Sequence, residues 1–335
     1  MQQEINLEFA YSDVRVKAMK HSILGQPLIR ELVDVKSVDE VIAILQNSAY
    51  KQPLIDASTR FSGVELLQKA LNAELGDSLG RLLRAVPRRF KPILRAILQV
   101  HDIENIKILF AKKHFGQDIS VFDFITLGKQ DADFLLELSR KGSLDDVVAA
   151  LQSKEYYRVL LPAFQEFKKS SSLTVIFDSL DRFYFNNLMS KITRETSGFK
   201  KLVASKIELQ DMLIALRLKE RGCEKDAKKY LINPSHSVAN SILNSRDLRE
   251  AMDYAKRKFA IKKELSTSSQ LEVELEKIFI QKALKMLRTT VLNFGTILGF
   301  YYLKCEEIAM LRKIALSKQY GLSEQMRGEI FSVSD

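Results

Sequence analysis

Residues 37–50 read SVDEVIAILQNSAY, and residues 143–156 read SLDDVVAALQSKEY. Seven of the fourteen positions are identical, and the second copy begins 106 positions after the first (143 − 37). Part of the remainder exchanges Val for Ile or Asp for Glu, so the apolar and acidic pattern is kept. A segment that returns in this form indicates that the chain contains an internal repeat.

Each copy begins with residues that favour the start of a helix. Ser37 and Ser143 are typical N-caps, and Glu40 and Asp146 stand three residues later, at the position of a capping box. Apolar residues follow at helical spacing: Val38, Val41, Ile42 and Leu45 in the first copy, and Leu144, Val147, Val148 and Leu151 in the second. Both copies therefore predict a short helix with one apolar stripe.

A second pattern recurs at the same offset and returns a third time. It begins with an acid, has Lys eleven residues later, and ends with Gly fourteen residues after the acid. Its members are Asp102, Lys113 and Gly116, then Glu208, Lys219 and Gly222, then Glu307, Lys318 and Gly321. We expect the acid near a helix N-terminus, the Lys in the last turn, and the Gly just beyond the helix with positive φ.

The repeats and the composition predict the fold class and the division of the chain. Of 335 residues 46% are hydrophobic, while Gly (13) and Pro (6) are scarce, and alternating strand patterns are nearly absent. We predict an all-α protein of three similar helical units, residues 1–118, 119–232 and 233–335. The third unit is the most diverged, and residues 245–259, SRDLREAMDYAKRKF, are its version of the first pattern.

The sequence contains no motif that indicates catalysis. GxxxxGK[ST], GxGxxG after a strand, HExxH and GxSxG are all missing. The two cysteines and four histidines lack metal-ligand spacing, and His101 and His114 read as cations near helix ends. We therefore expect no catalytic residue, no metal and no cofactor.

Neither end of the hydropathy range predicts membrane insertion. The first residues, MQQEINLEFAYSD, are polar and acidic and unlike a signal peptide. The most apolar stretch, residues 289–303, is shorter than the roughly 20 residues of a spanning helix. We interpret its Gly295-x-x-x-Gly299 as part of a buried helix that a neighbour approaches closely.

Basic charge concentrates in residues 81–95, RLLRAVPRRFKPILR, which contain no acid. This basic run consists of Arg81, Arg84, Arg88, Arg89, Lys91 and Arg95, and Pro87 and Pro92 are expected to break or kink its helix. It reads either as a solvated face or as a docking surface for an anionic partner. The net charge of +10 permits nucleic acid, an anionic membrane surface or an acidic protein as that partner.

Several stretches together resemble one known family, the C subunit of A/V-type rotary ATPases (the d subunit of the eukaryotic enzyme). YSDVRVKAMKHSIL from Tyr11, DRFYFNNL at 181–188, LRLKERG at 216–222 and YYLKCEEIAMLRKIALSKQYG at 301–321 are similar to its signatures, and the resemblance covers nearly the whole chain. The positions that match the family's motifs are Tyr11, Arg15, Asn105, Lys107, Lys113, Asp211, Lys219, Glu307, Arg312 and Lys318. Met310 stands where the last signature prefers Asn, which leaves the polar contact at that site unsupported in the third unit.

The resemblance implies three helical domains around a pseudo-threefold axis, arranged as a funnel. It implies a non-catalytic central-stalk subunit of an H⁺- or Na⁺-translocating ATPase or ATP synthase. Such a protein is monomeric within the complex and is a socket on the cytoplasmic face of the membrane, between the central shaft and the proteolipid ring. Anionic lipid headgroups are a further candidate partner.

A basic helical nucleic-acid-binding protein is the alternative. Against it, Trp is absent and the basic residues are not interleaved with stacking aromatics, so we expect no nucleic acid as partner.

Overall fold

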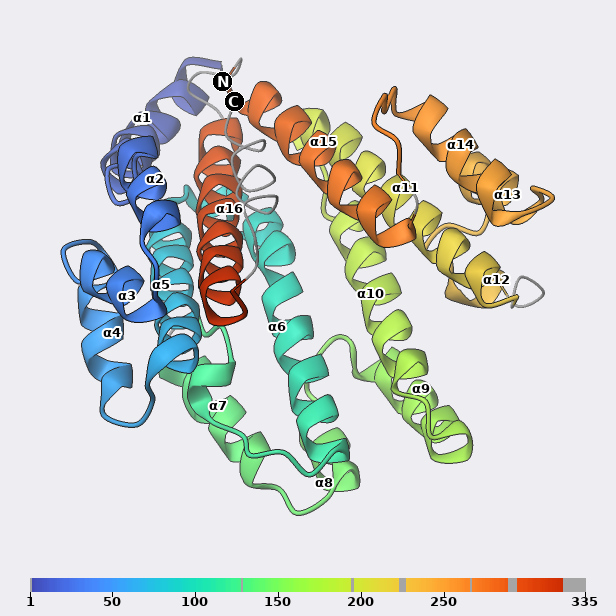
Figure 1. Cartoon of the computed structure of the whole chain (residues 1–335), viewed down its shortest axis with the longest axis horizontal. Helices are drawn as coiled ribbons and strands as arrows, with labels where there is room; N and C mark the ends of the chain where they lie inside the picture. The colour runs from blue at the N-terminus through green and yellow to red at the C-terminus, as the bar shows by residue number, and fades with distance from the viewer. Residues whose placement is uncertain are drawn as a thin grey trace. The chain divides into compact units, whose positions relative to one another are not determined.

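The structure is a computed structural model that describes residues 2–321 apart from 128, 194–195, 223–226, 266 and 289–293. Helices dominate this part of the chain, and it contains no strand, which confirms the predicted all-α class (Figure 1). The chain divides into two compact units, Met1–Ala150 with Met286–Asp335, and Leu151–Lys285. The division into three units remains a prediction about the repeat.

The first unit contains the N-terminal helices and the C-terminal helix. Its elements are α1 (Gln2–Lys20), α2 (Gln26–Asp34), α3 (Val38–Leu45), α4 (Lys51–Ser58), α5 (Gly63–Ala85), η1 (Arg88–Phe90), α6 (Lys91–His114), η2 (Val121–Asp123), α7 (Lys129–Arg140), α8 (Leu144–Ala150) and α16 (Phe294–Gln319). Helix α16 packs against α1, α3 and α5, and Figure 1 shows it beside α5. The core of this unit therefore joins segments from both ends of the sequence.

The second unit is built around α11. Its elements are α9 (Tyr157–Ser170), α10 (Leu173–Ser190), α11 (Ser197–Glu220), α12 (Ala227–Tyr230), α13 (Ser237–Leu243), α14 (Leu248–Lys258) and α15 (Ser268–Arg288), the last of which extends past Lys285. Helix α11 packs against α10, α12, α13 and α14. Arg217 of α11 also pairs with Glu272 of α15 at 2.6 Å.

The order of helices repeats as the sequence predicts. Shifted by 106 positions, α3 to α6 coincide with α8 to α11 in order and nearly in length, and α6 and α11 each have 24 residues. The third copy matches less closely, because α14, α15 and α16 follow one another and residues 259–265 and 267, between α14 and α15, form no helix.

The predicted helix starts are confirmed in all three copies. The Ser37 hydroxyl accepts from the Glu40 N–H, and the Ser143 hydroxyl accepts from the Asp146 N–H, both at 3.2 Å. In the diverged copy Asp247 is the N-cap and accepts from the Glu250 N–H at 2.8 Å. The same local interaction thus begins α3, α8 and α14, although the capping residue differs.

The expected position of the three acids was wrong. Asp102, Glu208 and Glu307 lie inside the long helices, which begin eleven to thirteen residues earlier (102 − 91, 208 − 197, 307 − 294). The helices extend upstream because apolar residues continue at helical spacing there, as Ile93 and Ile97 do in α6, where both are buried. An acid inside a helix interacts with side chains and neighbouring backbone rather than with the helix N-terminus.

The glycines that end the pattern are confirmed as left-handed. Gly116, Gly222 and Gly321 have φ of 64°, 66° and 60°, each directly after the end of α6, α11 or α16. At Gly116 the next residue, Gln117, donates its N–H to the Lys112 carbonyl at 2.8 Å, as in a Schellman motif.

We expect Gly222→Val to lower the free energy of unfolding by about 1–2 kcal/mol. A Cβ at Gly222 would meet no atom within 4 Å, so the cost comes from the backbone conformation alone. Urea unfolding measures the change, and Gly142→Val is the matched control because Gly142 has no positive φ. Equal losses for the two variants would contradict this explanation.

Candidate functional site

A polar side chain of each long helix holds the segment that leads into the next short helix. In α6 the Asn105 amide donates to the Ile125 carbonyl at 2.8 Å and accepts from the Ile125 N–H at 2.9 Å. In α11 the Asp211 carboxylate accepts from the N–H groups of Ile232 and Asn233 at 2.6 and 3.0 Å. Asp211 is fully buried, and this burial raises the pKa of its carboxyl group.

The third long helix achieves the same contact from a different position. Met310 occupies the site equivalent to Asn105 and Asp211, and its side chain is buried and apolar. One helical turn earlier, the Glu307 carboxylate accepts from the Leu24 N–H, which lies in the segment that leads into α2. The contact therefore survives in the third copy, although the family's preferred Asn is replaced.

The repeated lysines hold the far ends of the same short helices. Each ammonium group donates to backbone carbonyls at or next to the C-terminus of a short helix, where carbonyls lack helical partners. The bonds run from Lys113 to Ser139 and Lys141 (2.9 and 2.6 Å), from Lys219 to Leu243 (3.2 Å), and from Lys318 to Val33. Thus α7, α13 and α2 are each attached at both ends to the long helix before them, and α2 is attached to α16, near the other end of the chain.

A buried ion network lies where α16 meets α5. The Lys304 ammonium has no solvent exposure and lies 2.8 Å from a Glu307 oxygen and 3.2 Å from a Glu74 oxygen. Tyr50 donates its hydroxyl proton to Glu307, and Lys304 also lies over the Tyr50 ring. Burial and the two carboxylates raise the pKa of Tyr50, so its hydroxyl stays protonated as a donor.

Arg81 connects this buried network with the surface. Its guanidinium group donates to Glu74 at 3.2 Å and to the Ser78 hydroxyl at 2.9 Å, while Ser78 itself donates to Glu74 at 2.7 Å. The Arg81 side chain is 44% exposed, whereas that of Glu74 is 4% exposed. One end of the network is therefore accessible from solvent.

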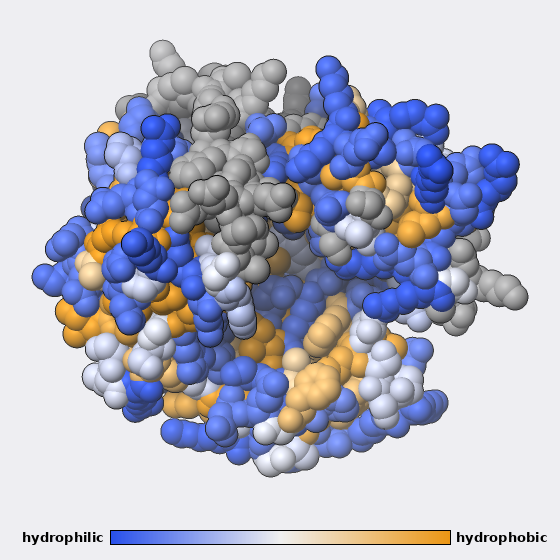
Figure 2. Space-filling model, viewed as in Figure 1, coloured by the Kyte–Doolittle hydropathy of each residue, from blue (hydrophilic) through white to orange (hydrophobic). Residues whose placement is uncertain are grey.

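The basic run divides between three elements. Arg81 and Arg84 belong to α5, Arg88 and Arg89 to η1, and Arg95 to α6, because α5 ends just before Pro87, as expected. All five arginines are exposed, and Lys91 is half-buried. Hydrophilic side chains cover much of the face in Figure 2, so exposure alone does not distinguish this run from the rest of the surface.

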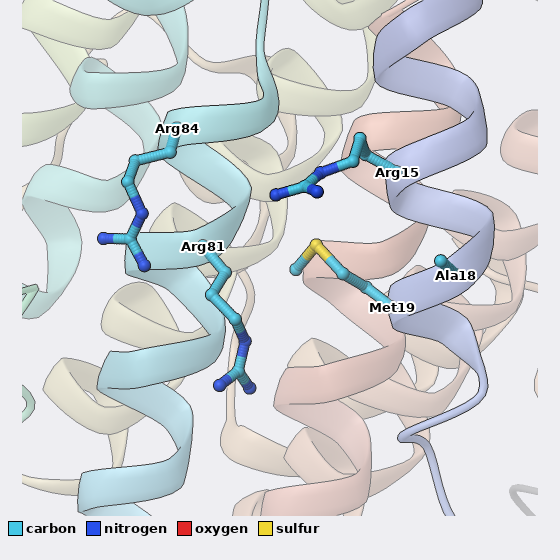
Figure 3. A pocket seen from close by; sticks show the side chains of 5 residues that line it. All are labelled: Arg15, Ala18, Met19, Arg81 and Arg84. Carbon is cyan, nitrogen blue, oxygen red and sulfur yellow. The ribbon is translucent and has the colours of Figure 1, made fainter.

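Two arginines of the run line a pocket together with residues of α1. The pocket has a volume of about 460 Å³ and is lined by Arg15, Ala18, Met19, Arg81 and Arg84. Figure 3 shows Arg15 and Met19 extending from α1 toward α5, and Arg81 and Arg84 extending from α5. The guanidinium group of Arg15 lies 5.9 Å from the ring centre of Tyr11, which is itself exposed.

The remaining motif positions make local contacts. Lys107 pairs with Glu104 at 2.8 Å on the same helix, and Arg312 of α16 donates to the Asn72 side chain of α5 at 2.5 Å. The structure therefore does not gather the motif positions into one cleft. Most of them fasten helices to one another.

The expectation for His101 was wrong, whereas His114 does lie in the last turn of α6. His101 is in the interior of α6 and is buried beside Tyr301, with the Tyr301 oxygen 3.5 Å from its Nε2. Burial, with a smaller effect of Arg312, lowers the pKa of His101 to about 4, so the ring is neutral near pH 7. The upstream extension of α6 is the reason for the difference.

Comparison with known proteins gives the family. The model of the ATP synthase (C/AC39) subunit family matches residues 13–329. The chain belongs to the ATP synthase (C/AC39) subunit family. Members of this family are structural subunits of the complex rather than catalytic ones, and this chain is such a subunit of a rotary ATPase.

Curated relatives in the ATP synthase (C/AC39) family extend over most of the chain. It is 24% identical to the C subunit of the A-type ATP synthase of Methanococcoides burtonii, over 95% of this chain and 92% of the relative. It is 23% identical to the protein of that name from Methanocaldococcus jannaschii, over 97% and 86%. A shorter match to the Methanosarcina acetivorans protein is 30% identical, over 65% and 60%.

Two expectations for this family member concern membranes and metals. No helix in the described residues has the length and apolarity that crossing a membrane requires, and residues 294–303 form the start of α16. Within the described residues no group of His, Cys, Asp or Glu has a metal-site arrangement. Cys223 lies outside the described residues, and burial raises the pKa of the Cys305 thiol to about 12.

Sequence reasoning missed the central residues of the buried network. Glu74 and Lys304 were not selected, although each interrupts an apolar face of a long helix. The spacing of Glu74 and Ser78, and of Lys304 and Glu307, places each pair on one helix face. A charged residue on an apolar face is the signal that points to such a network.

Proposed function

We propose that this chain is the central-stalk socket of an A-type rotary ATPase. In this proposal it lies on the cytoplasmic face of the membrane, holds the central shaft in its hollow, and contacts the proteolipid ring. It transmits torque between them and performs no chemistry of its own. The proposal extends the family assignment, and the curated relatives, which are named as C subunits of A-type ATP synthases, support it.

The observation that carries the proposal is the repeated attachment of short helices to long ones. A polar side chain in the middle of each long helix and a lysine at its end hold α7, α13 and α2 at both ends. A part that transmits torque has to resist separation of its helices. Three attachments of one kind, including one between the two ends of the chain, provide such resistance.

The same recurrence supports three similar domains around a pseudo-threefold axis, with the chain as a single copy in the complex. In each case the long helix also packs against the capped helix that follows the attached one, as α6 packs on α8, α11 on α14 and α16 on α3. One contact scheme used three times is what gene duplication followed by symmetric packing produces.

The basic run is our candidate contact surface for the shaft or the ring. Its exposed arginines suit bidentate pairing with carboxylates or lipid phosphates. Each exposed pair contributes only about 0–1 kcal/mol, so several substitutions are needed to test it. The variant Arg88→Glu/Arg89→Glu/Arg95→Glu leaves Arg81 and Arg84 in place, because Arg81 binds the buried Glu74 and both line the pocket.

We expect this triple variant to bind purified shaft subunits or proteolipid ring at least about tenfold more weakly than wild type at low salt. The difference should shrink at high salt, where screening is strongest. The measurement is equilibrium binding of the full chain to each partner at both salt concentrations.

The matched control is Arg30→Glu/Lys51→Glu/Arg60→Glu, which changes the charge equally at exposed positions of the first unit. The control should bind like wild type. Wild-type binding of the Arg88, Arg89 and Arg95 variant to both partners at both salt concentrations would reduce the basic run to a solvated face. Loss in both variants would indicate a general effect of charge.

A further inference from the structure

The pocket between α1 and α5 presents three guanidinium groups to one space. Arg15 approaches it from α1, whereas Arg81 and Arg84 belong to successive turns of α5, and Figure 3 shows all three at the same opening. Met19 and Ala18 add an apolar part to the lining. A space of about 460 Å³ has room for a small organic molecule.

Two of the three charges have no acidic partner in the part of the chain that the structure describes. Arg81 and Lys304 are balanced by Glu74 and Glu307 in the buried network. Arg15 and Arg84 form no ion pair with a described carboxylate, and the nearby Asp13 pairs with Lys17 at 2.6 Å. The pocket therefore carries two unbalanced positive charges.

The arginines are partly fixed before any ligand arrives. Arg81 is held by Glu74 and Ser78, both of which are buried. Arg15 lies over the Tyr11 ring, a contact that restricts the guanidinium while its N–H groups stay at the edge. Fixed donors lose less conformational entropy when they bind an anion, so affinity is gained by preorganisation.

We propose that this pocket binds the phosphate group of a phosphate monoester. Such a group carries a charge of about −1.5 to −2 at pH 7 and three terminal oxygens that accept hydrogen bonds. It thus matches both the two unbalanced charges and the three guanidinium groups, whereas one carboxylate balances only half of the charge. Met19 and Ala18 would contact the organic part of the ester.

The test is calorimetric titration of the full chain with phenyl phosphate and with benzoate at constant ionic strength. These probes share an apolar ring and differ in their anionic group. We expect 1:1 binding of phenyl phosphate, roughly tenfold or more tighter than binding of benzoate. Equal affinity for the two probes, or no binding of phenyl phosphate, would overturn the proposal.

Variants separate the pocket from the general positive charge of the protein. Arg15→Gln/Arg84→Gln should weaken phenyl phosphate binding by roughly tenfold or more, since charge-assisted hydrogen bonds are lost. The control Arg30→Gln/Arg60→Gln removes two exposed charges elsewhere and should bind like wild type. An equal loss in both double variants would show non-specific attraction and would contradict the assignment. All substituted side chains are exposed, so folding should be preserved, and unfolding temperatures check this.

A second arm distinguishes a lipid from a soluble ester. Vesicles of phosphatidylcholine with phosphatidic acid present a monoester at a membrane surface, and pure phosphatidylcholine vesicles do not. Retention on the acidic vesicles that is lost in Arg15→Gln/Arg84→Gln identifies a lipid headgroup, whereas binding of the soluble probe alone identifies a soluble ester. A glutamate-rich peptide that displaces phenyl phosphate and binds tighter would instead make the pocket a protein-docking site, contrary to the proposal.

This inference is independent of the socket proposal, and the experiments keep the two apart. The assembly test changes Arg88, Arg89 and Arg95, none of which lines the pocket. The phosphate test changes Arg15 and Arg84 and requires neither shaft nor ring.

Discussion

Replacing Lys304 with alanine is expected to lower the free energy of unfolding by about 3–5 kcal/mol. The variant leaves Glu74 and Glu307 buried with one cation fewer, although the Lys304 ammonium now lies within 3.2 Å of both. Taking a charge out of water without a partner is the costly step, more than the loss of any one contact. Urea unfolding followed by circular dichroism measures the change.

Two further variants show whether the network is the cause. Lys313→Ala removes an exposed lysine from the same helix and should change the free energy of unfolding by less than about 0.5 kcal/mol. Tyr50→Phe keeps the buried ring, removes one donor to Glu307, and should cost about 1–2 kcal/mol. A loss for Lys304→Ala no greater than that for Lys313→Ala would mean that the buried charges are compensated by other means.

Replacing Gly76 with alanine is expected to destabilise the first unit by about 2–3 kcal/mol. A Cβ at Gly76 would stand 2.2 Å from the carbonyl oxygen of Thr126, a backbone atom that cannot rotate away. The segment around Thr126 is held by Asn105 at Ile125 and by Asn72 at the Phe122 and Asp123 carbonyls. The collision should outweigh the roughly 1 kcal/mol by which alanine exceeds glycine in a helix.

Gly80→Ala is the matched control, one turn later on the same face of α5. Its Cβ would lie 3.1 Å from the Leu127 carbonyl oxygen, so a small shift relieves the contact. We expect this variant to stay within about 1 kcal/mol of wild type, because helix propensity offsets the strain. Equal stability of the two alanine variants would show that the segment moves away from α5 easily.

The features that the sequence predicted correctly depend on neighbours within a few residues. Caps at Ser37 and Ser143, and left-handed glycines such as Gly222, follow from local backbone hydrogen bonding and sterics. The helix order followed because each cap recurs in register. Family membership came from the order of the motifs along the chain rather than from any one of them.

The features that the sequence did not predict depend on contacts between distant segments. Glu74 meets Lys304 across 230 positions (304 − 74), and spacing within a helix says nothing of which helix lies opposite. The three acids were misplaced because the pattern began at the acid, although apolar residues continue upstream of it. Met310 showed that a contact was lost at one position, but not that Glu307 would replace it.

The candidate site divides in the same way. The basic run is visible in the sequence as a count of charges, and its exposure follows from that. The pocket requires Arg15 of α1 to approach α5, an arrangement that depends on how both helices pack against α16. A family-motif arginine and two residues of the basic run thus share a site that neither pattern indicates alone.

The bonds from α16 to the segment before α2 and to its end also set an order for biosynthesis. Leu24 and Val33 leave the ribosome long before Glu307 and Lys318, their partners 283 and 285 residues later. At about 5–20 residues per second, the N-terminal helices wait roughly 15–60 s for the helix that completes their core. Residues 151–285 form a compact unit of their own and are synthesised within this interval. The nascent chain therefore exposes the unfinished apolar faces of α2 and α3 until translation is nearly over, which makes this interval the one in which chaperones protect it most.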